Sequence, residues 1–237
     1  PLIVASAGTT DRIALILEPR CHPALEHVVR NASLCLGESW QILIAHGIDN
    51  EDYVRSCFTK TELSTLQLLN LHVDNLTRRA YSELLCSHWL WEQLQGEHVL
   101  IFQTDSLLCR GPNAIDEFVN AYDYVGAPWR LDQTWSKGVP WLSHAGNGGL
   151  SLRSRSITLK MLDAIDYSRG EAEDMFFVEH VPRVGGRLAS RQAAAAFSLE
   201  AADDVGVTQP VGFHAAHKYL ARERFEGLLR AVEQSYV

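Results

Sequence analysis

The sequence predicts an α/β layered domain built on a mainly parallel central sheet. Apolar runs short enough for strands are separated by stretches with helical spacing, and this alternation favours βαβ units. The run at residues 98–104 (HVLIFQT) has no polar alternation, as expected for a strand covered on both faces. Hydrophobic residues make up 46% of the 237-residue chain, which is ample for a sizeable core.

The first part of the chain carries the clearest elements. Residues 12–19 (RIALILEP) and 40–47 (WQILIAHG) predict buried strands on either side of a helical stretch at residues 23–36. Residues 66–73 (LQLLNLHV) predict a third strand. These segments give the first βαβ units of the expected sheet.

Residues 75–95 place apolar side chains at four-residue spacing and predict one amphipathic helix with Asn75 as its N-cap. The strand at residues 98–104 follows and ends at Asp105. Ligands of open α/β sheets bind beyond the carboxyl ends of the strands, and a buried strand holds the residue at its end rigidly. Asp105 is therefore a candidate site residue.

The second half is less regular. It contains the segments 122–129 (YDYVGAPW) and 149–155 (GLSLRSR), joined by a loop that carries Trp and Gly, and helical stretches near residues 156–166 and 172–180. Neither an internal repeat nor a linker occurs, so residues 1–237 are expected to form one domain.

Charge and known motifs exclude several function classes. The net charge is −8 and no stripe of Lys and Arg occurs, which makes nucleic acid an unexpected partner. The P-loop, HExxH, GxSxG and GxGxxG motifs are absent, which argues against P-loop kinases, zinc proteases, α/β-hydrolases and dehydrogenases. The visible chain has no membrane segment. We expect a soluble domain, in the cytoplasm or, if an N-terminal anchor has been trimmed, in a secretory lumen.

A loose set of residues remains as candidates for a site. Each has an ordinary structural interpretation, as a turn, a helix cap or a loop histidine. Together they suit a sugar nucleotide, because a carboxylate and a histidine can hold a divalent cation against a departing diphosphate. A second carboxylate can act as general base, and Trp129 and Trp141 offer faces for sugars. The candidates are Glu18, Arg20, Asp105, Trp129, Gly146–Gly149, Glu173, Asp174 and His214.

The blocks EPRCHP, LIFQTDS, YDYVGAPW, GNGGLSLRSRS, EDMFF and GFHAAH, in this order over residues 12–217, resemble a family of glycosyltransferases related to GT-A-fold enzymes and long catalogued as a domain of unknown function. The resemblance implies a GT-A-like (Rossmann-like) sandwich, a single catalytic domain, and transfer of a sugar from a nucleoside-diphosphate sugar, with a UDP-sugar favoured, to an acceptor hydroxyl. It also implies Mn²⁺ (or Mg²⁺) as cofactor and a glycan or other hydroxyl compound as acceptor.

The resemblance also implies roles for the residues that match the family's motifs. Asp105 and His214 are implied as metal ligands, although Gln103 stands where the DxD motif has its first acid. Asp174 is implied as the catalytic base of an inverting enzyme, with Glu173 beside it. The residues implied to contact the nucleotide sugar are Glu18, Arg20, Thr104, Asp105, Trp129, Asn147, Gly148 and Gly149.

Three alternatives stay open at this point. The loss of an acid at Gln103 also suits a non-catalytic nucleotide- or carbohydrate-binding module. A nucleotidyltransferase shares the architecture, but no Gly-rich loop follows the first strand. A retaining mechanism could use the same fold without a dedicated base.

Glu173 and Asp174 are adjacent in a predicted helix. Neighbouring side chains on a helix diverge by about 100°, so only one of Glu173 and Asp174 is expected to face a cleft.

Overall fold

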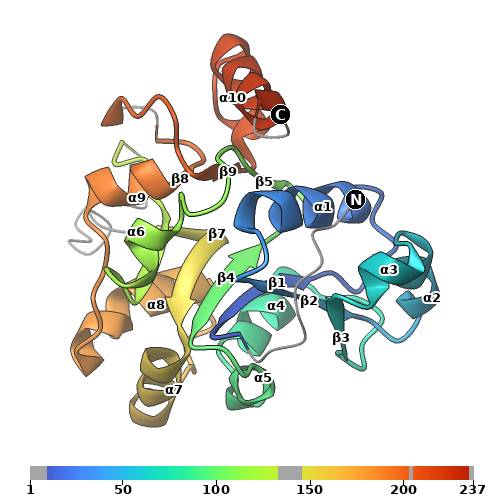
Figure 1. Ribbon diagram of the computed structural model, residues 1–237. Coiled ribbons are helices and arrows are strands. Elements are labelled where there is room, and N and C mark those ends of the chain that lie inside the picture. The colour runs from blue at the N-terminus through green and yellow to red at the C-terminus, as the bar shows by residue number, and fades with distance from the viewer. Residues whose placement is uncertain (1–9, 133–145, 203–204, 235–237) are drawn as a thin grey trace.

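The computed structural model describes residues 10–132, 146–202 and 205–234, and its main feature is a six-stranded sheet in the order β3-β2-β1-β4-β7-β6 (Figure 1). β1 to β4 run parallel, and β7 is antiparallel to both of its neighbours. The expected α/β fold with a mainly parallel central sheet is therefore confirmed. The strands are β1 (Arg12–Leu17), β2 (Gln41–His46), β3 (Leu66–Asn70), β4 (His98–Phe102), β6 (Tyr124–Ala127) and β7 (Asn147–Ser154).

Helices cover both faces of this sheet, which explains why its central strands are apolar throughout. The connection from β1 to β2 runs toward the β3 edge of the sheet, whereas the connection from β3 to β4 runs toward the β6 edge. Because both crossovers are right-handed, helices that connect strands in opposite directions lie on opposite faces of the sheet. The helices are α1 (Leu25–Leu36), α2 (Glu51–Ser56), α3 (Lys60–Leu63), α4 (Arg78–Leu85), α5 (His88–Gln93), α6 (Asp116–Val119), α7 (Arg155–Ala164), α8 (Glu173–His180), α9 (Arg191–Phe197) and α10 (Arg222–Gln234).

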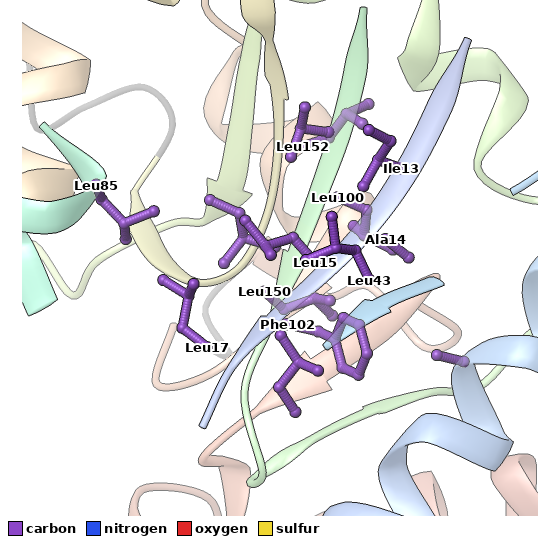
Figure 2. Packing of buried hydrophobic residues seen from close by; sticks show 14 of the residues in the cluster. Ile13, Ala14, Leu15, Leu17, Leu43, Leu85, Leu100, Phe102, Leu150 and Leu152 are labelled. Carbon is purple, nitrogen blue, oxygen red and sulfur yellow. The ribbon is translucent and has the colours of Figure 1, made fainter. Parts of the chain in front are cut away.

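The hydrophobic core lies against β1, β4 and β7. Figure 2 shows Leu15 from β1, Leu100 from β4 and Leu152 from β7 among the packed side chains, and all three are buried. Burying each such side chain contributes roughly 1.5–3 kcal/mol. Among the described residues, no helix combines the length and the hydropathy needed to cross a membrane.

The single helix expected at residues 75–95 is instead two short helices, α4 and α5. Thr77, not Asn75, caps α4, because its Oγ1 accepts a hydrogen bond from Ala80 N at 3.1 Å. Ser87 then caps α5 in the same manner, accepting from Leu90 N at 3.4 Å. The apolar spacing continues through the break, which is why periodicity alone did not reveal it.

A second, three-stranded sheet lies beyond the large one, in the order β5-β9-β8. Its strands are β5 (Ser106–Leu108), β8 (Ser198–Leu199) and β9 (Gly212–His214). β5 follows β4 directly, so this small sheet lies at the carboxyl edge of the parallel strands, and α10 covers it (Figure 1). Phe213, Leu228 and Val232 form part of a separate hydrophobic cluster between the two.

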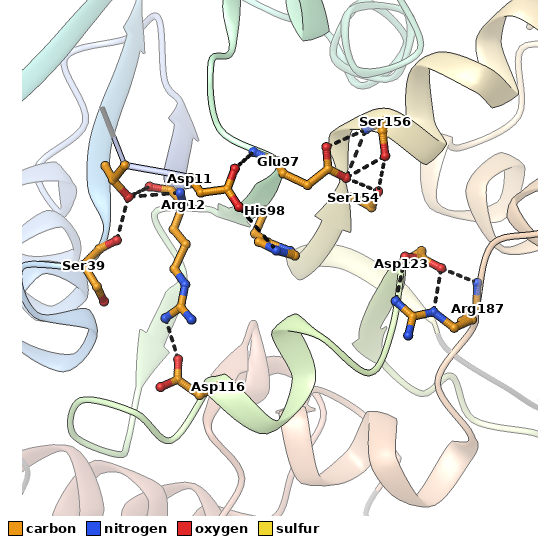
Figure 3. Close-up of polar contacts among 11 residues, drawn as sticks. Asp11, Arg12, Ser39, Glu97, His98, Asp116, Asp123, Ser154, Ser156 and Arg187 are labelled. Carbon is orange, nitrogen blue, oxygen red and sulfur yellow. Dashed lines mark hydrogen bonds and ion pairs between the residues drawn. The ribbon is translucent and has the colours of Figure 1, made fainter. Parts of the chain in front are cut away.

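The opposite edge of the large sheet is held by polar contacts (Figure 3). Arg12, at the start of β1, donates to Asp116 at 2.6 Å, and Arg187 pairs with Asp123 at 3.0 Å just before β6. Ser154, at the end of β7, donates to Glu97 at 2.6 Å. These contacts fix the strands at the edge that carries no candidate residue, and leave the carboxyl edge for the site.

Candidate functional site

A pocket of about 490 Å³ lies at the carboxyl edge of the large sheet, between its strand ends and the small sheet. This volume is within the range of about 300–1,000 Å³ that is usual for sites of small ligands. The sequence-predicted residues that line the pocket are Glu18, Arg20, Thr104, Asp105, Asn147, Gly148, Gly149, Glu173, Asp174 and His214. Five separate segments of the chain thus meet where the fold class predicts a ligand.

The turn after β4 presents Asp105 to the pocket. Ser106 N donates to Gln103 O at 3.0 Å, and Gln103 N donates to Ser106 Oγ at 3.1 Å, so the two residues close a tight turn. Ser106 Oγ then donates to Gly149 O at 2.9 Å and ties this turn to β7. The small polar residues around Asp105 therefore build the turn that carries it.

Asp105 and His214 lie in contact, with Asp105 Oδ1 3.1 Å from His214 Nε2. On its other oxygen, Oδ2, Asp105 accepts from Lys218 Nζ at 2.8 Å. Burial opposes the charge of Asp105, but His214 and Lys218 outweigh it and hold the pKa of this carboxyl well below its usual range. Burial likewise disfavours charge on the imidazole, yet Asp105 and Glu200 raise the pKa of His214 to about 9.

Three donor atoms in this cluster have the spacing of cation ligands. The Gln103 amide oxygen and the Asp105 carboxylate each lie 3.1 Å from His214 Nε2, the separation of neighbouring ligands around an ion with bonds of about 2.1 Å. Within the described ranges, no three His, Cys, Asp or Glu side chains form a group that could hold a metal. The protein would thus supply Asp105, His214 and the neutral Gln103, with phosphate oxygens and water as further ligands.

Gly148 and Gly149 are glycines because site residues occupy the space of a side chain. A Cβ at Gly148 would lie 2.2 Å from Glu173 Oε1 and 2.6 Å from Arg153 Nη2. A Cβ at Gly149 would lie 2.3–2.4 Å from three atoms of the His214 ring. The backbone at the start of β7 therefore lies directly against Glu173 and Arg153 at Gly148 and against the His214 ring at Gly149.

Glu173, at the start of α8, points into the protein toward a buried arginine. Its Oε1 accepts from Arg153 Nη2 at 3.0 Å, and its Oε2 lies 3.5 Å from Ser82 Oγ. The Arg153 side chain is 0% exposed, and its guanidinium carbon lies 4.3 Å from the centre of the Phe177 ring. Glu173 is thus held by an ion pair on the floor of the pocket.

Asp174 is partly exposed to the pocket and accepts from two backbone amides. Its Oδ1 accepts from Met175 N at 2.8 Å, and its Oδ2 accepts from Gly148 N at 3.3 Å. Burial and then the negative charge of Glu173 raise the pKa of Asp174 to about 7. A carboxyl with this pKa is suited to accepting a proton near neutral pH.

Glu18 and Arg20 follow β1 at the other end of the pocket. Two nitrogens of the Arg20 guanidinium, Nε and Nη2, each donate to a Glu18 oxygen at 2.8 Å. Asn50 Nδ2 donates to the carbonyls of both residues, at 3.0 and 2.9 Å, and fixes the loop. The buried Glu18 therefore fixes the planar guanidinium of the half-exposed Arg20 at the pocket.

Trp129 stands apart from the other sequence-predicted residues. Its side chain is buried in the hydrophobic core, and it is not among the residues that line the pocket. Trp141 lies outside the described residues.

Sequence reasoning did not single out several residues that line or support the pocket. Arg78 and Tyr81 from α4, Glu200 after β8 and Lys218 after β9 line it, and Arg153 lies below Glu173. Of these residues, Arg153 could have been recognised from the sequence, because it is the charged residue in a strand of otherwise uncharged side chains. The others have ordinary surface sequence contexts, and their placement depends on the tertiary fold.

Comparison with known sequences gives one family. The family model described as "Protein of unknown function (DUF5672)" matches residues 65–214. No curated protein gives a significant match to this sequence.

Solved structures give a consistent fold. The mannosyltransferase PcManGT from Pyrobaculum calidifontis, in complex with GDP-Man and Mn²⁺, is 17% identical with a TM-score of 0.52, over 79% of this chain and 56% of that one. The apo-form glycosyltransferase GlyE of Streptococcus pneumoniae TIGR4 is 12% identical with a TM-score of 0.51, over 96% and 63%. A further GlyE structure gives 11% and 0.52, over 96% and 64%.

The chain thus spans about 56–64% of the length of these structures, and the likeness is one of fold. Together with the family match, it confirms the resemblance to a GT-A-like family catalogued as a domain of unknown function.

Proposed function

The chain belongs to the DUF5672 family of proteins of unknown function, and from this premise and the pocket geometry we propose that it is a glycosyltransferase that moves a sugar from a nucleoside-diphosphate sugar to an acceptor hydroxyl. The observation that carries the proposal is the division of one pocket into two chemical ends. Asp105, His214 and Lys218 form an end suited to a diphosphate, and Asp174 supplies a carboxyl that titrates near neutral pH at the other.

At the diphosphate end, Lys218 offers an ammonium group, and Arg20 offers a guanidinium after β1, the strand next to β4. Asp105, His214 and Gln103 would hold a Mn²⁺ or Mg²⁺ ion, which when bound neutralises charge on the leaving diphosphate. Thr104 and the backbone of Asn147 to Gly149 also line the pocket, and we place the donor sugar beside them.

At the other end, Asp174 takes the proton of the acceptor hydroxyl. The acceptor oxygen forms its bond to the anomeric carbon while the bond from that carbon to the diphosphate breaks, and the nucleoside diphosphate leaves. Glu173 is committed to Arg153 and Ser82, which supports Asp174 as the base and Glu173 as its neighbour that raises its pKa. Attack opposite the leaving group would invert the anomeric centre. We also propose that the chain forms one catalytic domain, because both sheets contribute to this pocket.

The test is release of nucleotide from a panel of UDP-, GDP- and other nucleotide sugars, with UDP-sugars first, in the presence and absence of Mn²⁺ and of simple glycan acceptors. We expect one donor to be turned over with metal, and Asp105→Asn and Asp174→Asn each to lower the rate by at least about 100-fold. NMR of the product anomer reports inversion or retention. Full activity in Asp174→Asn with retention would remove the general base from the proposal.

The second candidate is a non-catalytic nucleotide- or carbohydrate-binding module. It is favoured by the neutral Gln103 beside Asp105 and by the Lys218 ammonium on the second Asp105 oxygen, since both reduce the negative charge available to a cation. This candidate predicts that the protein binds a nucleotide by calorimetry, turns over no donor, and binds equally well after Asp174→Asn.

A further inference from the structure

Glu200 is a buried carboxylate that no sequence motif identifies. It follows β8 directly, is 7% exposed and lines the pocket. Removing a carboxylate from water costs free energy unless a partner compensates for it. The partner in this protein is His214, because Glu200 Oε1 lies 3.2 Å from His214 Nδ1. In the part of the chain that the structure describes, the buried Nδ1 makes no hydrogen bond, and this ion-pair contact with Glu200 is what faces it.

The small sheet produces this contact through its register. β8 pairs with β9 in parallel, with Leu199 opposite Phe213, so the next step along both strands brings Glu200 beside His214. β5 pairs with β9 from the other side, with Ser106 opposite His214, which brings Asp105 to the second ring nitrogen. The three strands therefore align two carboxylates on opposite edges of one imidazole ring.

The ring is fixed on its face as well as on its edges. The bare backbone of Gly149 lies against the ring, since an added Cβ would approach three ring atoms to 2.3–2.4 Å. On its Nε2 edge the ring meets the Asp105 carboxylate and the Gln103 amide oxygen, each at 3.1 Å. A rotation of the ring would break the contacts at both nitrogens, so its orientation is set by the fold.

We propose that Glu200 is a positioning residue that acts through His214: its carboxylate faces Nδ1 and holds the ring in the orientation that turns Nε2 toward Asp105 and Gln103, where a divalent cation would bind in place of the Nε2 proton. A histidine binds a metal through an unprotonated ring nitrogen, and a carboxylate on the other nitrogen fixes both tautomer and orientation. The inference rests on the cation site of the proposed function.

The experiment measures Mn²⁺ affinity of the purified chain by electron paramagnetic resonance, without donor or acceptor. Glu200→Ala removes both the charge and the acceptor atom, and we expect Mn²⁺ to bind 10–100-fold more weakly. Glu200→Gln keeps an amide oxygen that can accept from Nδ1, and we expect a smaller loss. Circular dichroism confirms that each variant is folded, and Glu200→Gln serves if Glu200→Ala is not.

A double-mutant cycle separates positioning from simple loss of charge. If Glu200 acts through His214, Glu200→Gln has no further effect on Mn²⁺ affinity in a His214→Ala background. An equal loss in both backgrounds, or a change below twofold in the single variants, overturns the inference. So does a wild-type chain that binds no Mn²⁺ at millimolar concentrations. Donor turnover by the wild-type chain is scored separately: Mn²⁺ binding that depends on Glu200 without any turnover supports the inference and refutes the transferase.

Discussion

Replacing Asp174 with asparagine is expected to lower the rate of transfer by at least about 100-fold and, at the same time, to stabilise the folded protein at alkaline pH. The pKa of Asp174 is raised from 3.8 to about 7 by burial and by Glu173. A folded-state pKa above the unfolded value means that the folded protein holds this proton more tightly. The contribution to stability is complete below pH 3.8 and is lost as pH rises through about 7.

The size of the effect follows from these two pKa values. Between pH 5 and pH 8 the wild-type protein should lose on the order of 2–3 kcal/mol relative to a variant that has no ionisable group at this position. Asparagine offers only one acceptor oxygen to the two amides, Met175 N and Gly148 N, that the carboxylate satisfies. This mismatch costs Asp174→Asn about 1 kcal/mol at every pH and leaves the pH dependence unchanged.

The assay is urea unfolding of wild type and Asp174→Asn at half-unit intervals from pH 5 to pH 8. Asp49→Asn, which removes an exposed carboxyl outside the pocket, is the matched control for loss of one charge. The difference in free energy of unfolding between Asp174→Asn and wild type should grow with pH. A difference that is constant over this range, or that shrinks, would refute the argument that burial and Glu173 keep Asp174 protonated.

Three further perturbations test other parts of the site. Arg153→Met leaves the buried Glu173 carboxylate without its ion-pair partner and should lower the free energy of unfolding by about 3–5 kcal/mol, measured by urea unfolding at pH 7. Gly149→Ala should displace the His214 ring and weaken Mn²⁺ binding without loss of helical content by circular dichroism, whereas unchanged binding would show that the ring is free to move aside. Lys218→Met should weaken UDP or GDP binding about tenfold or more by calorimetry if its ammonium contacts the diphosphate.

The layered fold could be predicted because its strands are short apolar runs whose burial on both faces leaves a simple pattern. Residues 12–19, 40–47 and 98–104 each contain a strand of the large sheet. Helix boundaries were harder to predict, since the division of residues 75–95 into two helices depends on the hydroxyl groups of Thr77 and Ser87 competing for backbone amides.

The candidate site was predictable where a residue ends a strand or lies in a motif, as Asp105 and Asp174 do. Glu200 and Lys218 were not, because their approach to His214 and Asp105 depends on strand register and on a turn late in the chain. For Glu173 and Asp174, helix geometry indicated that the two side chains diverge. Both residues nevertheless line the pocket, so the expectation that only one would face a cleft was wrong. What separates them is their partners, because the buried Arg153 pairs with Glu173, whereas Asp174 accepts from backbone amides.

The pairing of Ser106 with His214 also has a kinetic consequence. It joins positions that are far apart in the chain, and closing so long a loop costs entropy before any contact compensates for it. The parallel strands β1, β2 and β3 join nearer neighbours and can form earlier during folding or synthesis. We therefore expect the pocket to be completed late, after the large sheet, and a nascent chain that has not yet reached His214 carries Asp105 without its histidine.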